Sequence, residues 1–149
     1  MSTHQQLLYH IVFSTKHRKP TLIDGFRGDV WAYMAGIISN LGGVALKVGG
    51  FYDHAHLLIR IPAKFSVSDF VGQLKANTSK HINEESETIS KFSWQDGFGA
   101  FTVSVSQKDR IHRYIERQME YHQKITFENE YLNLLKKHEI DFDLKYIWE

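Results

Sequence analysis

The chain has 149 residues, of which 42% are hydrophobic and 23% are charged, and this is ordinary globular usage. It has no cysteine, which excludes disulfides and thiolate metal sites, and its formal net charge of +1 means that any nucleic-acid binding must rest on local basic patches. Because no apolar run approaches membrane-spanning length and no signal-peptide core is present, we expect a soluble cytoplasmic protein with one domain over residues 1–149.

The first half of the chain predicts strands around a helix. Residues 5–14 are rich in β-branched and aromatic side chains and predict a strand. The segment 21–24 resembles a helix capping box, apolar residues then recur at helical spacing, and Gly42-Gly43 ends a helix of about five turns. Residues 44–48 alternate as a second strand, and after a Gly-Gly turn a third strand ends near Pro62. The second and third strands are close enough to form an antiparallel hairpin.

The middle of the chain predicts a second helix and a fourth strand. The pattern Ser66-x-x-Asp69 caps the helix, and residues 84–90 are polar and predict a loop. The segment 92–99 is aromatic and rich in glycine, which predicts a shaped loop rather than a linker. Residues 101–105 alternate between apolar and polar side chains and predict the fourth strand.

Two helices and an arm are predicted after the fourth strand. A capping pattern at Ser106 opens a helix over about residues 107–123. Thr126 caps the next helix, so that a C-terminal helix and arm occupy about residues 126–149. Apolar side chains alternate from residue 140 to residue 148, which suggests an extended arm lying on an apolar surface.

The order of the predicted elements is β-α-β-β-α-β, followed by helices. This is the order of the split βαβ, ferredoxin-like sandwich. We therefore predict an α+β fold with a four-stranded antiparallel sheet and additional C-terminal helices. In this topology the first and third strands are central, and the two early helices cover one face of the sheet. The other face is left for nucleic acid or for a further helix.

Two histidines stand two residues apart in the predicted third strand. Because strand side chains alternate between faces, His54 and His56 share one face, while Ala55, Leu57 and Ile59 form an apolar row on the other. Two neutral imidazoles are good ligands for a divalent metal ion, but a firm site needs a third ligand. Histidines that only pack or hydrogen-bond in the strand are the alternative.

The helix over residues 107–123 offers a third ligand and a nucleophile. Tyr114 and Gln118 are four residues apart and share a helix face. The side-chain carbonyl of Gln118 can complete the metal site, which places Tyr114 beside the ion. A divalent cation that holds a phosphate favours the phenolate, so that attack forms a covalent phosphotyrosine. A tyrosine packed against the sheet and a solvated amide are the alternatives.

Two groups of basic residues are candidates for DNA contacts. Positive charge around the tyrosine suits a nucleic-acid backbone and comes from Arg110, Arg113 and Arg117. A basic loop after the first strand is either a solvated turn or a phosphate contact, and it contains Lys16, Arg18 and Lys19. In the second case we expect the loop to contact a nucleic-acid backbone.

The pattern as a whole resembles a known family. His54-Ala55-His56 resembles the HUH motif, in which U is a hydrophobic residue. Tyr114-x-x-x-Gln118 resembles the nucleophile helix of the small single-tyrosine transposases of bacterial insertion sequences, the IS-two-hundred/IS-six-oh-five group. The resemblance covers nearly the whole chain, through the segments 9–19, 53–58, 94–101, 113–118 and 141–148.

The resemblance implies a DNA transposase that cleaves and rejoins single-stranded DNA at insertion-sequence ends and recognises terminal hairpins. It implies that His54, His56 and Gln118 bind Mg²⁺ or Mn²⁺, although two imidazoles would also accept zinc or nickel. Tyr114 would form a 5′-phosphotyrosine link and release a 3′-hydroxyl without a nucleotide cofactor. The resemblance also implies a homodimer whose subunits exchange tyrosine helices to complete composite active sites. His10, on the neighbouring central strand, could approach the site.

Two other functions fit part of this pattern. A host-adopted relative would keep the fold and the site but act as a hairpin-specific nuclease, and its genomic neighbourhood would distinguish it. A non-catalytic module that binds single-stranded nucleic acid would need exposed aromatic residues on the central strands, where the third strand offers His54, His56, Leu58 and Arg60. The sequence leaves open the hairpin and target sequences, the metal used in the cell, and whether Tyr114 acts in cis or in trans.

Overall fold

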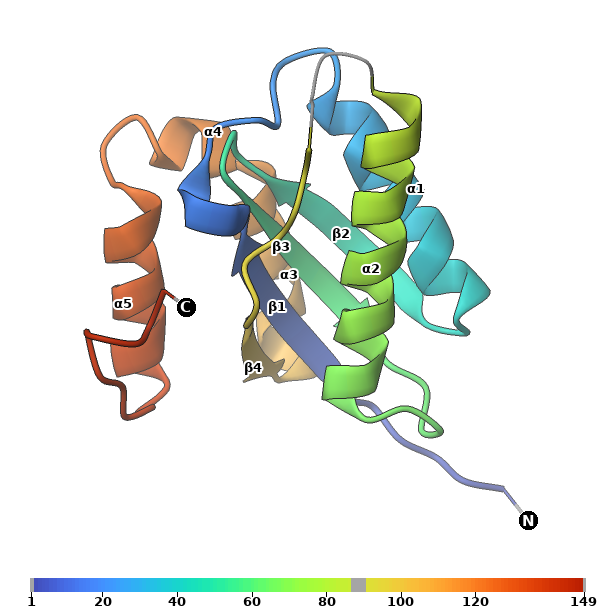
Figure 1. The fold of residues 1–149 in the computed structure, drawn as a ribbon. Helices are drawn as coiled ribbons and strands as arrows, with labels where there is room; N and C mark the ends of the chain where they lie inside the picture. Colours follow the sequence, from blue (N-terminus) through green and yellow to red (C-terminus); the bar gives the residue numbers. More distant parts are fainter. Residues whose placement is uncertain (1, 87–90, 149) are drawn as a thin grey trace.

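A four-stranded antiparallel sheet forms the centre of the molecule. The computed structural model describes residues 2–86 and 91–148. The strands lie in the order β2-β3-β1-β4, and every neighbouring pair is antiparallel (Figure 1). Their bounds are Leu8–Ser14 for β1, Val44–Gly50 for β2, His54–Arg60 for β3 and Gly99–Val103 for β4. The predicted ferredoxin-like α+β fold, with the first and third strands in the middle, is confirmed.

The two early helices cover one face of the sheet, as predicted. Helix α1 spans Arg27–Asn40 and helix α2 spans Val67–Glu85 (Figure 1). Every second residue of β1 and β3 points to this face, and these residues are apolar. The main core contains Ile11, Phe13, Met34, Ala55, Leu57, Ile59, Phe70 and Leu74.

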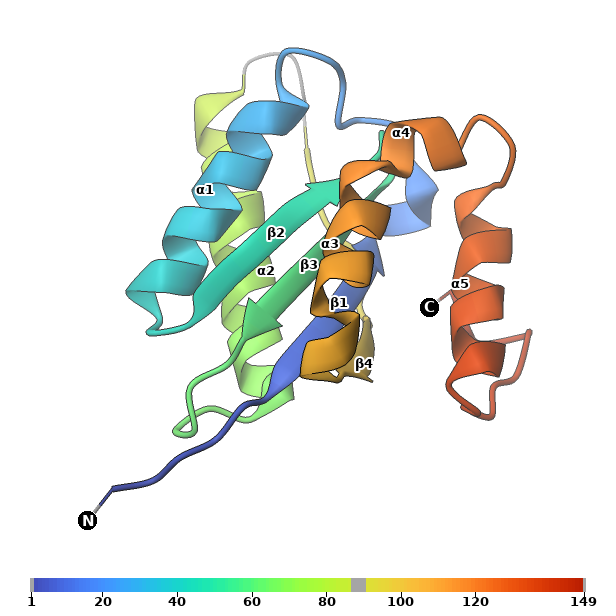
Figure 2. The same ribbon diagram turned by 180° about the vertical axis from the view of Figure 1, so that it is seen from behind.

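Three further helices lie on the opposite face, where the predicted topology leaves room for them. Helix α3 spans Lys108–Glu116, α4 spans Gln118–Tyr121 and α5 spans Phe127–Lys137 (Figure 2). Helix α5 is held by a second, smaller cluster of buried side chains, namely Val12, Phe101, Phe127, Tyr131 and Leu135. The polar face of the central strands is therefore enclosed between α3, α4 and α5.

Helix α3 lies directly on β2 because Gly49 has no side chain. A Cβ atom at this position would be 2.9 Å from Ile115 Cγ2 and 3.1 Å from the Ile115 carbonyl oxygen. Real Cβ atoms almost never approach other atoms so closely. The absence of a side chain at Gly49 thus sets how near the tyrosine helix comes to the sheet.

Two of the predicted helix caps are confirmed. The Ser66 hydroxyl accepts a hydrogen bond from the Asp69 N–H at 3.1 Å, which starts α2. The Thr126 hydroxyl accepts from the Asn129 N–H at 3.2 Å, which starts α5. Both caps place the first turn of their helix as the sequence pattern indicates.

The other two predicted caps are wrong. Helix α1 begins only at Arg27, because Gly25 has a left-handed φ of 79° that no α-helix contains, and the Asp24 carboxylate accepts hydrogen bonds from the side chains of Arg27 and Tyr52. The residue before α3 is Gln107, and Ser106 lies in a short 3₁₀ turn over Val105–Gln107. In each case a different partner, or a tighter turn, competes with the helix cap.

The tyrosine helix is broken rather than continuous over residues 107–123. Arg117 has φ −99° and ψ 19°, which ends α3 and separates it from α4.

Residues 84 and 85 belong to α2 and not to the predicted polar loop, whose residues 87–90 lie outside the described part of the chain. The predicted shape of the aromatic loop is confirmed, because Lys75 Nζ donates to its carbonyls at Gln95 and Gly97.

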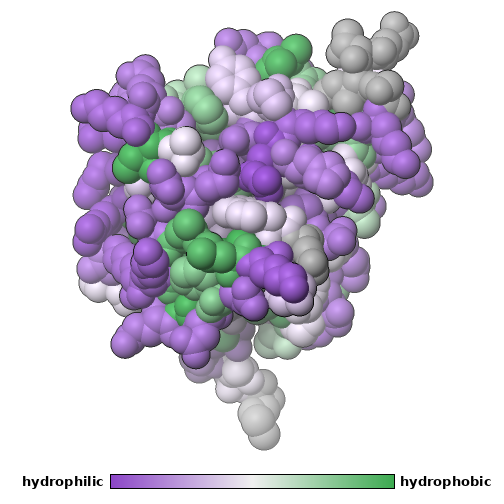
Figure 3. Space-filling model, turned by 60° about the vertical axis from the view of Figure 1, so that its left-hand side comes forward, coloured by the Kyte–Doolittle hydropathy of each residue, from purple (hydrophilic) through white to green (hydrophobic). Residues whose placement is uncertain are grey.

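The C-terminal segment after α5 forms turns and not an extended arm. Phe142, Ile147 and Trp148 pack against the smaller cluster, so the expected apolar surface is α5 of the same chain. Figure 3 turns the side that carries α5 and this segment toward the reader, and shows a hydrophobic patch among hydrophilic side chains. Exposed apolar side chains of the segment include Ile140 and Leu144. No helix in residues 2–86 and 91–148 is long and apolar enough to cross a membrane.

Candidate metal and nucleophile site

His54 and His56 lie side by side on the face that α3, α4 and α5 enclose. Both side chains are fully buried, with 0% exposure, because they occupy the central strand β3 under these helices. His122, which follows α4, brings a third imidazole to the same point. The strand alternation therefore places the predicted pair correctly, and the helices add to it.

Each of the three imidazoles has its Nδ1 atom held by a neighbouring group. The Nδ1 partners are the Asp53 carboxylate for His54 at 2.7 Å, His10 Nε2 for His56 at 2.8 Å and the Ile125 carbonyl for His122 at 2.6 Å. A carboxylate and a carbonyl can only accept, so His54 and His122 donate from Nδ1 and, when neutral, present the Nε2 lone pair inward. Orientation of this kind is typical of histidines that bind a metal ion.

Two oxygen atoms face the three Nε2 atoms. Gln118 Oε1 lies 2.9 Å from the Nε2 atoms of both His54 and His122. Glu130 Oε1 lies 3.1 Å from the Nε2 atoms of both His56 and His122, and 3.3 Å from that of His54. In an octahedral site with bonds of about 2.1 Å, neighbouring ligands are about 3.0 Å apart. The five donor atoms therefore have the chemistry and the spacing that a divalent cation requires.

The second oxygen of Glu130 faces Tyr114. Glu130 Oε2 accepts hydrogen bonds from the Tyr114 hydroxyl and, at 3.0 Å, from Gln118 Nε2. Glu130 is buried, with 1% exposure. One carboxylate thus joins the three imidazoles to the tyrosine, and Tyr114 and Gln118 share a side of the helix as predicted despite the break at Arg117.

The electrostatics of the cluster favour positive charge at its centre. Burial lowers the pKa of His54, but hydrogen bonds to Asp53 and Glu130 outweigh burial and raise the pKa to about 9. Burial opposes ionisation of Glu130 too, yet the surrounding histidines hold its pKa far below the usual range. Positive charge beside the Glu130 carboxylate can come from His54 in its doubly protonated, cationic form or from a bound metal ion.

The same carboxylate suppresses ionisation of Tyr114. Burial, and then the negative charge of Glu130, raise the pKa of Tyr114 well above its ordinary value. Burial lowers the pKa of His56, although Glu130 opposes this change. The protein groups alone therefore keep the Tyr114 hydroxyl protonated at neutral pH, and activation needs further positive charge.

The structure brings His54, His56, Tyr114 and Gln118 together, and it adds two residues that the sequence reasoning missed. His122 is four residues beyond Gln118, and this spacing could have indicated a shared helix face. Glu130 gave no signal, because an acidic residue in an amphipathic helix is ordinary. His10 does approach the site, but it holds the His56 ring and does not face the other donors.

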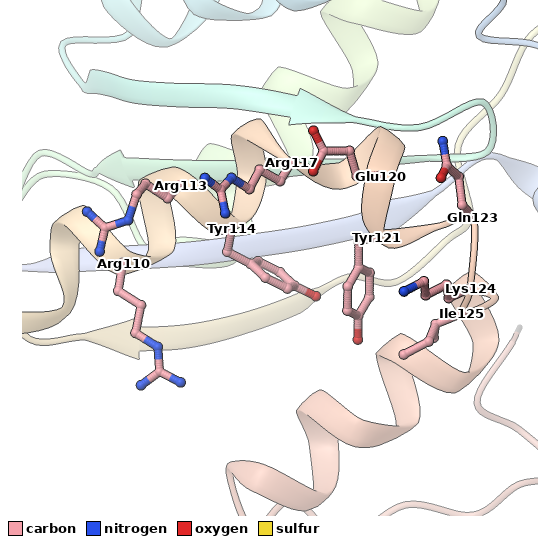
Figure 4. A pocket seen from close by; sticks show the side chains of 9 residues that line it. All are labelled: Arg110, Arg113, Tyr114, Arg117, Glu120, Tyr121, Gln123, Lys124 and Ile125. Atoms are coloured by element: carbon pink, nitrogen blue, oxygen red, sulfur yellow. The ribbon is translucent and has the colours of Figure 1, made fainter.

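The predicted basic residues separate into two regions. Arg110, Arg113 and Arg117 line an open cavity of about 780 Å³ next to Tyr114 (Figure 4). Lys16 and Lys19 line a different hollow of about 300 Å³, together with Lys91 and Thr21. The Arg18 side chain does not line this hollow. Its guanidinium is instead 3.8 Å from the Glu128 carboxylate and 4.7 Å from the Trp148 ring centroid.

The chain is similar to proteins of known sequence. The family model described as "Transposase IS200 like" matches residues 3–118. The transposase for insertion sequence element IS200 of Salmonella typhimurium is 31% identical over 118 residues, which cover 75% of this chain and 76% of the relative. The ISDra2 transposase TnpA of Deinococcus radiodurans is 24% identical over 118 residues, with coverages of 76% and 84%.

Solved structures agree on the fold. A transposase crystal structure from Deinococcus radiodurans R1 superposes with a TM-score of 0.60 at 22% identity, and covers 79% of this chain and 98% of that chain. A REP-associated tyrosine transposase bound to a REP hairpin gives a TM-score of 0.61 at 11% identity, with coverages of 84% and 76%. With the family match spanning most of its length, the chain belongs to the IS200-like transposases, a family of DNA-cleaving enzymes.

Proposed function

We propose that this transposase cleaves and rejoins single-stranded DNA at insertion-sequence ends through a 5′-phosphotyrosine formed by Tyr114. The observation that carries the proposal is the position of Glu130, whose Oε2 accepts from the Tyr114 hydroxyl while its Oε1 faces the Nε2 atoms of His54, His56 and His122. A tyrosine that only packed against the sheet would have no need of a buried carboxylate shared with three imidazoles.

The residues that would hold a divalent cation are His54, His56, Gln118, His122 and Glu130. A site with only oxygen donors selects Mg²⁺ or Mn²⁺ more strictly. A site with three nitrogen and two oxygen donors accepts these ions and also accepts zinc or nickel. When bound, the ion polarises the scissile phosphate and favours the phenolate of the tyrosine. This set extends the expected ligands by the two side chains of His122 and Glu130.

The side chains have separate tasks in the cleavage step. The Tyr114 hydroxyl is held by Glu130 Oε2, and its proton moves to this oxygen only as the phenolic oxygen forms its bond to phosphorus, because the carboxylate alone is too weak a base to ionise the free phenol. The bond from phosphorus to the 3′-oxygen breaks, and that oxygen takes up the proton released by Tyr114 from Glu130 and leaves as the free 3′-hydroxyl. Later attack of a 3′-hydroxyl on the phosphotyrosine rejoins the strands, so no nucleotide cofactor is consumed.

Hairpin recognition belongs to the proposal because a structural relative is bound to a REP hairpin. Lys16, Lys19 and Lys91 around one hollow suit the phosphates of a duplex stem. Replacing Lys16 and Lys19 together by alanine should weaken hairpin binding and flatten its dependence on salt. A salt titration of hairpin affinity measures this effect, and an unchanged slope would remove these lysines from the interface.

A homodimer with composite active sites stays a prediction. In a single chain, Tyr114 already reaches the Glu130 that contacts its own imidazoles, which supports a reaction in cis. An exchange of α3 between two copies would keep the same contacts. Mixing an inactive Tyr114→Phe chain with an inactive His56→Ala chain distinguishes the two, because only action in trans restores cleavage.

The main experiment seeks the covalent intermediate. The protein is incubated with Mg²⁺ or Mn²⁺ and labelled single-stranded DNA from the ends of its element, and a denaturing gel detects a protein–DNA adduct. We expect an adduct with the parent protein and none with Tyr114→Phe, whereas Tyr33→Phe on the opposite face of the sheet keeps it. If the parent binds the hairpin and forms no adduct, the non-catalytic binding module replaces this proposal.

A host-adopted, hairpin-specific nuclease would give the same adduct. It differs in its substrate, which would be repeated hairpins dispersed in the genome rather than the ends of one element. Cleavage of both kinds of hairpin under equal conditions, together with the genomic neighbourhood, separates the two roles.

A further inference from the structure

The open cavity beside Tyr114 has the composition of a site for single-stranded nucleic acid. Its volume is about 780 Å³, and Figure 4 shows its lining side chains on α3, α4 and the turn that leads to α5. Tyr114 and Tyr121 are its aromatic members. Four cations surround them, namely Arg110, Arg113, Arg117 and Lys124.

The four cations are available for phosphates. Within the described ranges, 2–86 and 91–148, none of these side chains forms an ion pair with a carboxylate. All four are exposed, and Glu120 is the only acidic residue among the described residues that line the cavity. Unpaired cations around a hollow favour a polyanion, because each can release a counterion from a phosphate backbone.

Tyr121 is fixed in a position next to the nucleophile. Its ring centroid lies 5.4 Å from that of Tyr114, at an interplanar angle of 66°, and 5.2 Å from that of His122 at 90°. The rise of a DNA duplex is about 3.4 Å per nucleotide along its axis, so the 5.4 Å between the two rings is of the order of one nucleotide. A base beside a phosphate held at Tyr114 would therefore be within reach of the Tyr121 ring.

We infer that this cavity binds the single-stranded nucleotides beside the scissile phosphate, with one base stacked on Tyr121 and the backbone held by the four cations. The inference rests on the proposed function, because it takes Tyr114 as the nucleophile. Aromatic stacking combined with a basic groove binds single strands with little dependence on sequence. The site thus positions the strand for attack, while hairpin contacts elsewhere supply recognition.

A binding experiment isolates the base from the phosphates. The probe is a labelled oligothymidylate of about eight nucleotides, within the usual range of single-strand sites, compared with an abasic oligomer of equal length and charge. Both are titrated against a Tyr114→Phe protein, which cannot cleave, with and without the additional change Tyr121→Leu. Tyr121→Phe keeps the aromatic face, and Tyr33→Leu on the opposite face of the sheet is the matched control.

We expect Tyr121→Leu to weaken binding of oligothymidylate about 5- to 150-fold and to leave binding of the abasic oligomer unchanged. Tyr121→Phe and Tyr33→Leu should bind both probes like the parent. If Tyr121→Leu weakens both probes equally, or neither, the stacking site is refuted. Circular dichroism of each variant shows whether its fold is retained.

An adduct assay separates this inference from the proposed function. With Tyr114 intact, Tyr121→Leu should raise the DNA concentration needed for half-maximal adduct formation and leave the maximal rate nearly unchanged. An adduct formed by the parent and by Tyr121→Leu with equal DNA dependence overturns the inference alone. The absence of any adduct with the parent overturns the proposed function, and the binding experiment still decides whether the cavity holds a stacked base.

Discussion

The two sides of the candidate site are built in different ways. His54 and His56 project from a central strand that pairs with β1 along its whole length and with β2 from Ala55 to Arg60. Their partners come from the four-residue helix α4, from the turn after it, and from α5, which is held by the smaller hydrophobic cluster. The family match ends at Gln118, so His122 and Glu130 belong to the part of the chain beyond it.

This difference suggests a division of tasks. The strand side is rigid and buried, and it fixes two imidazoles to the framework of the fold. The helix side carries the carboxylate and the nucleophile on elements with fewer contacts, and local opening free energies are lowest where buried contacts are few. We therefore expect substitutions on the strand side to remove the site and substitutions on the helix side to tune it.

The largest effect is expected on the strand side. His56→Ala should lower the rate of adduct formation about 1,000-fold, because a bound ion supplies several kcal/mol of transition-state stabilisation. His81→Ala, on the opposite face, is the control, and thermal unfolding checks the fold. A rate within tenfold of the parent would show that β3 does not hold an essential ion. His56→Gln offers a second test should the alanine variant fail to fold.

The next largest effect is expected for Glu130→Gln on the helix side. This substitution removes the negative charge of the carboxylate and keeps the volume of the side chain. We expect Mn²⁺ affinity, measured by calorimetry, to fall about 10- to 100-fold, with a parallel loss of adduct. Glu128→Gln in the same helix is the matched control. Parent-like Mn²⁺ affinity together with lost adduct would instead leave Glu130 as the proton acceptor of Tyr114 alone.

His122→Asn should have a smaller effect, about tenfold on Mn²⁺ affinity, because the two imidazoles that β3 fixes in the framework of the fold remain in place. The change also removes the hydrogen bond from His122 Nδ1 to the Ile125 carbonyl, which shapes the turn before α5. His112→Asn, exposed on α3, is the control for the loss of an imidazole. A loss as large as that of His56→Ala would erase the distinction between the two sides.

The smallest effect is expected where the C-terminal segment meets the basic loop. Arg18→Ala removes a partly exposed ion pair with Glu128 and a cation–π contact with Trp148, and should lower the free energy of unfolding by less than about 1 kcal/mol. Lys19→Ala is the control. Chemical denaturation measures the change, and a loss of several kcal/mol would show that the helix side depends on this contact.

The strand side could be predicted from the sequence because local periodicity determines it. Alternation along β3 places His54 and His56 together, and the four-residue spacing places Gln118 beside Tyr114. The position of Glu130 depends on the packing of α5 against β1 and β4, which no local pattern encodes. The same reason explains the wrong cap at α1, where Asp24 finds its partner in Tyr52 from another part of the chain.

The C-terminal segment shows a further limit of periodicity. Alternation over residues 140–148 favours an extended arm, yet the backbone folds into turns because α5 offers a compact apolar surface close by. Apolar side chains two residues apart can also reach such a surface from successive turns. The pattern therefore predicted that the segment is covered, and it did not determine the backbone conformation.

The close approach of α3 to β2 at Gly49 has a consequence for how the enzyme can change. The distance of the helix that carries Tyr114 from the sheet depends on the missing side chain of Gly49, and this residue is not part of the candidate site. A methyl group added at Gly49 would push α3 away from β2. It would leave the charges and the donor atoms of the candidate site unchanged. A side chain added at Gly49 would thus test how the position of Tyr114 affects the proposed cleavage, without a change in any group of the candidate site.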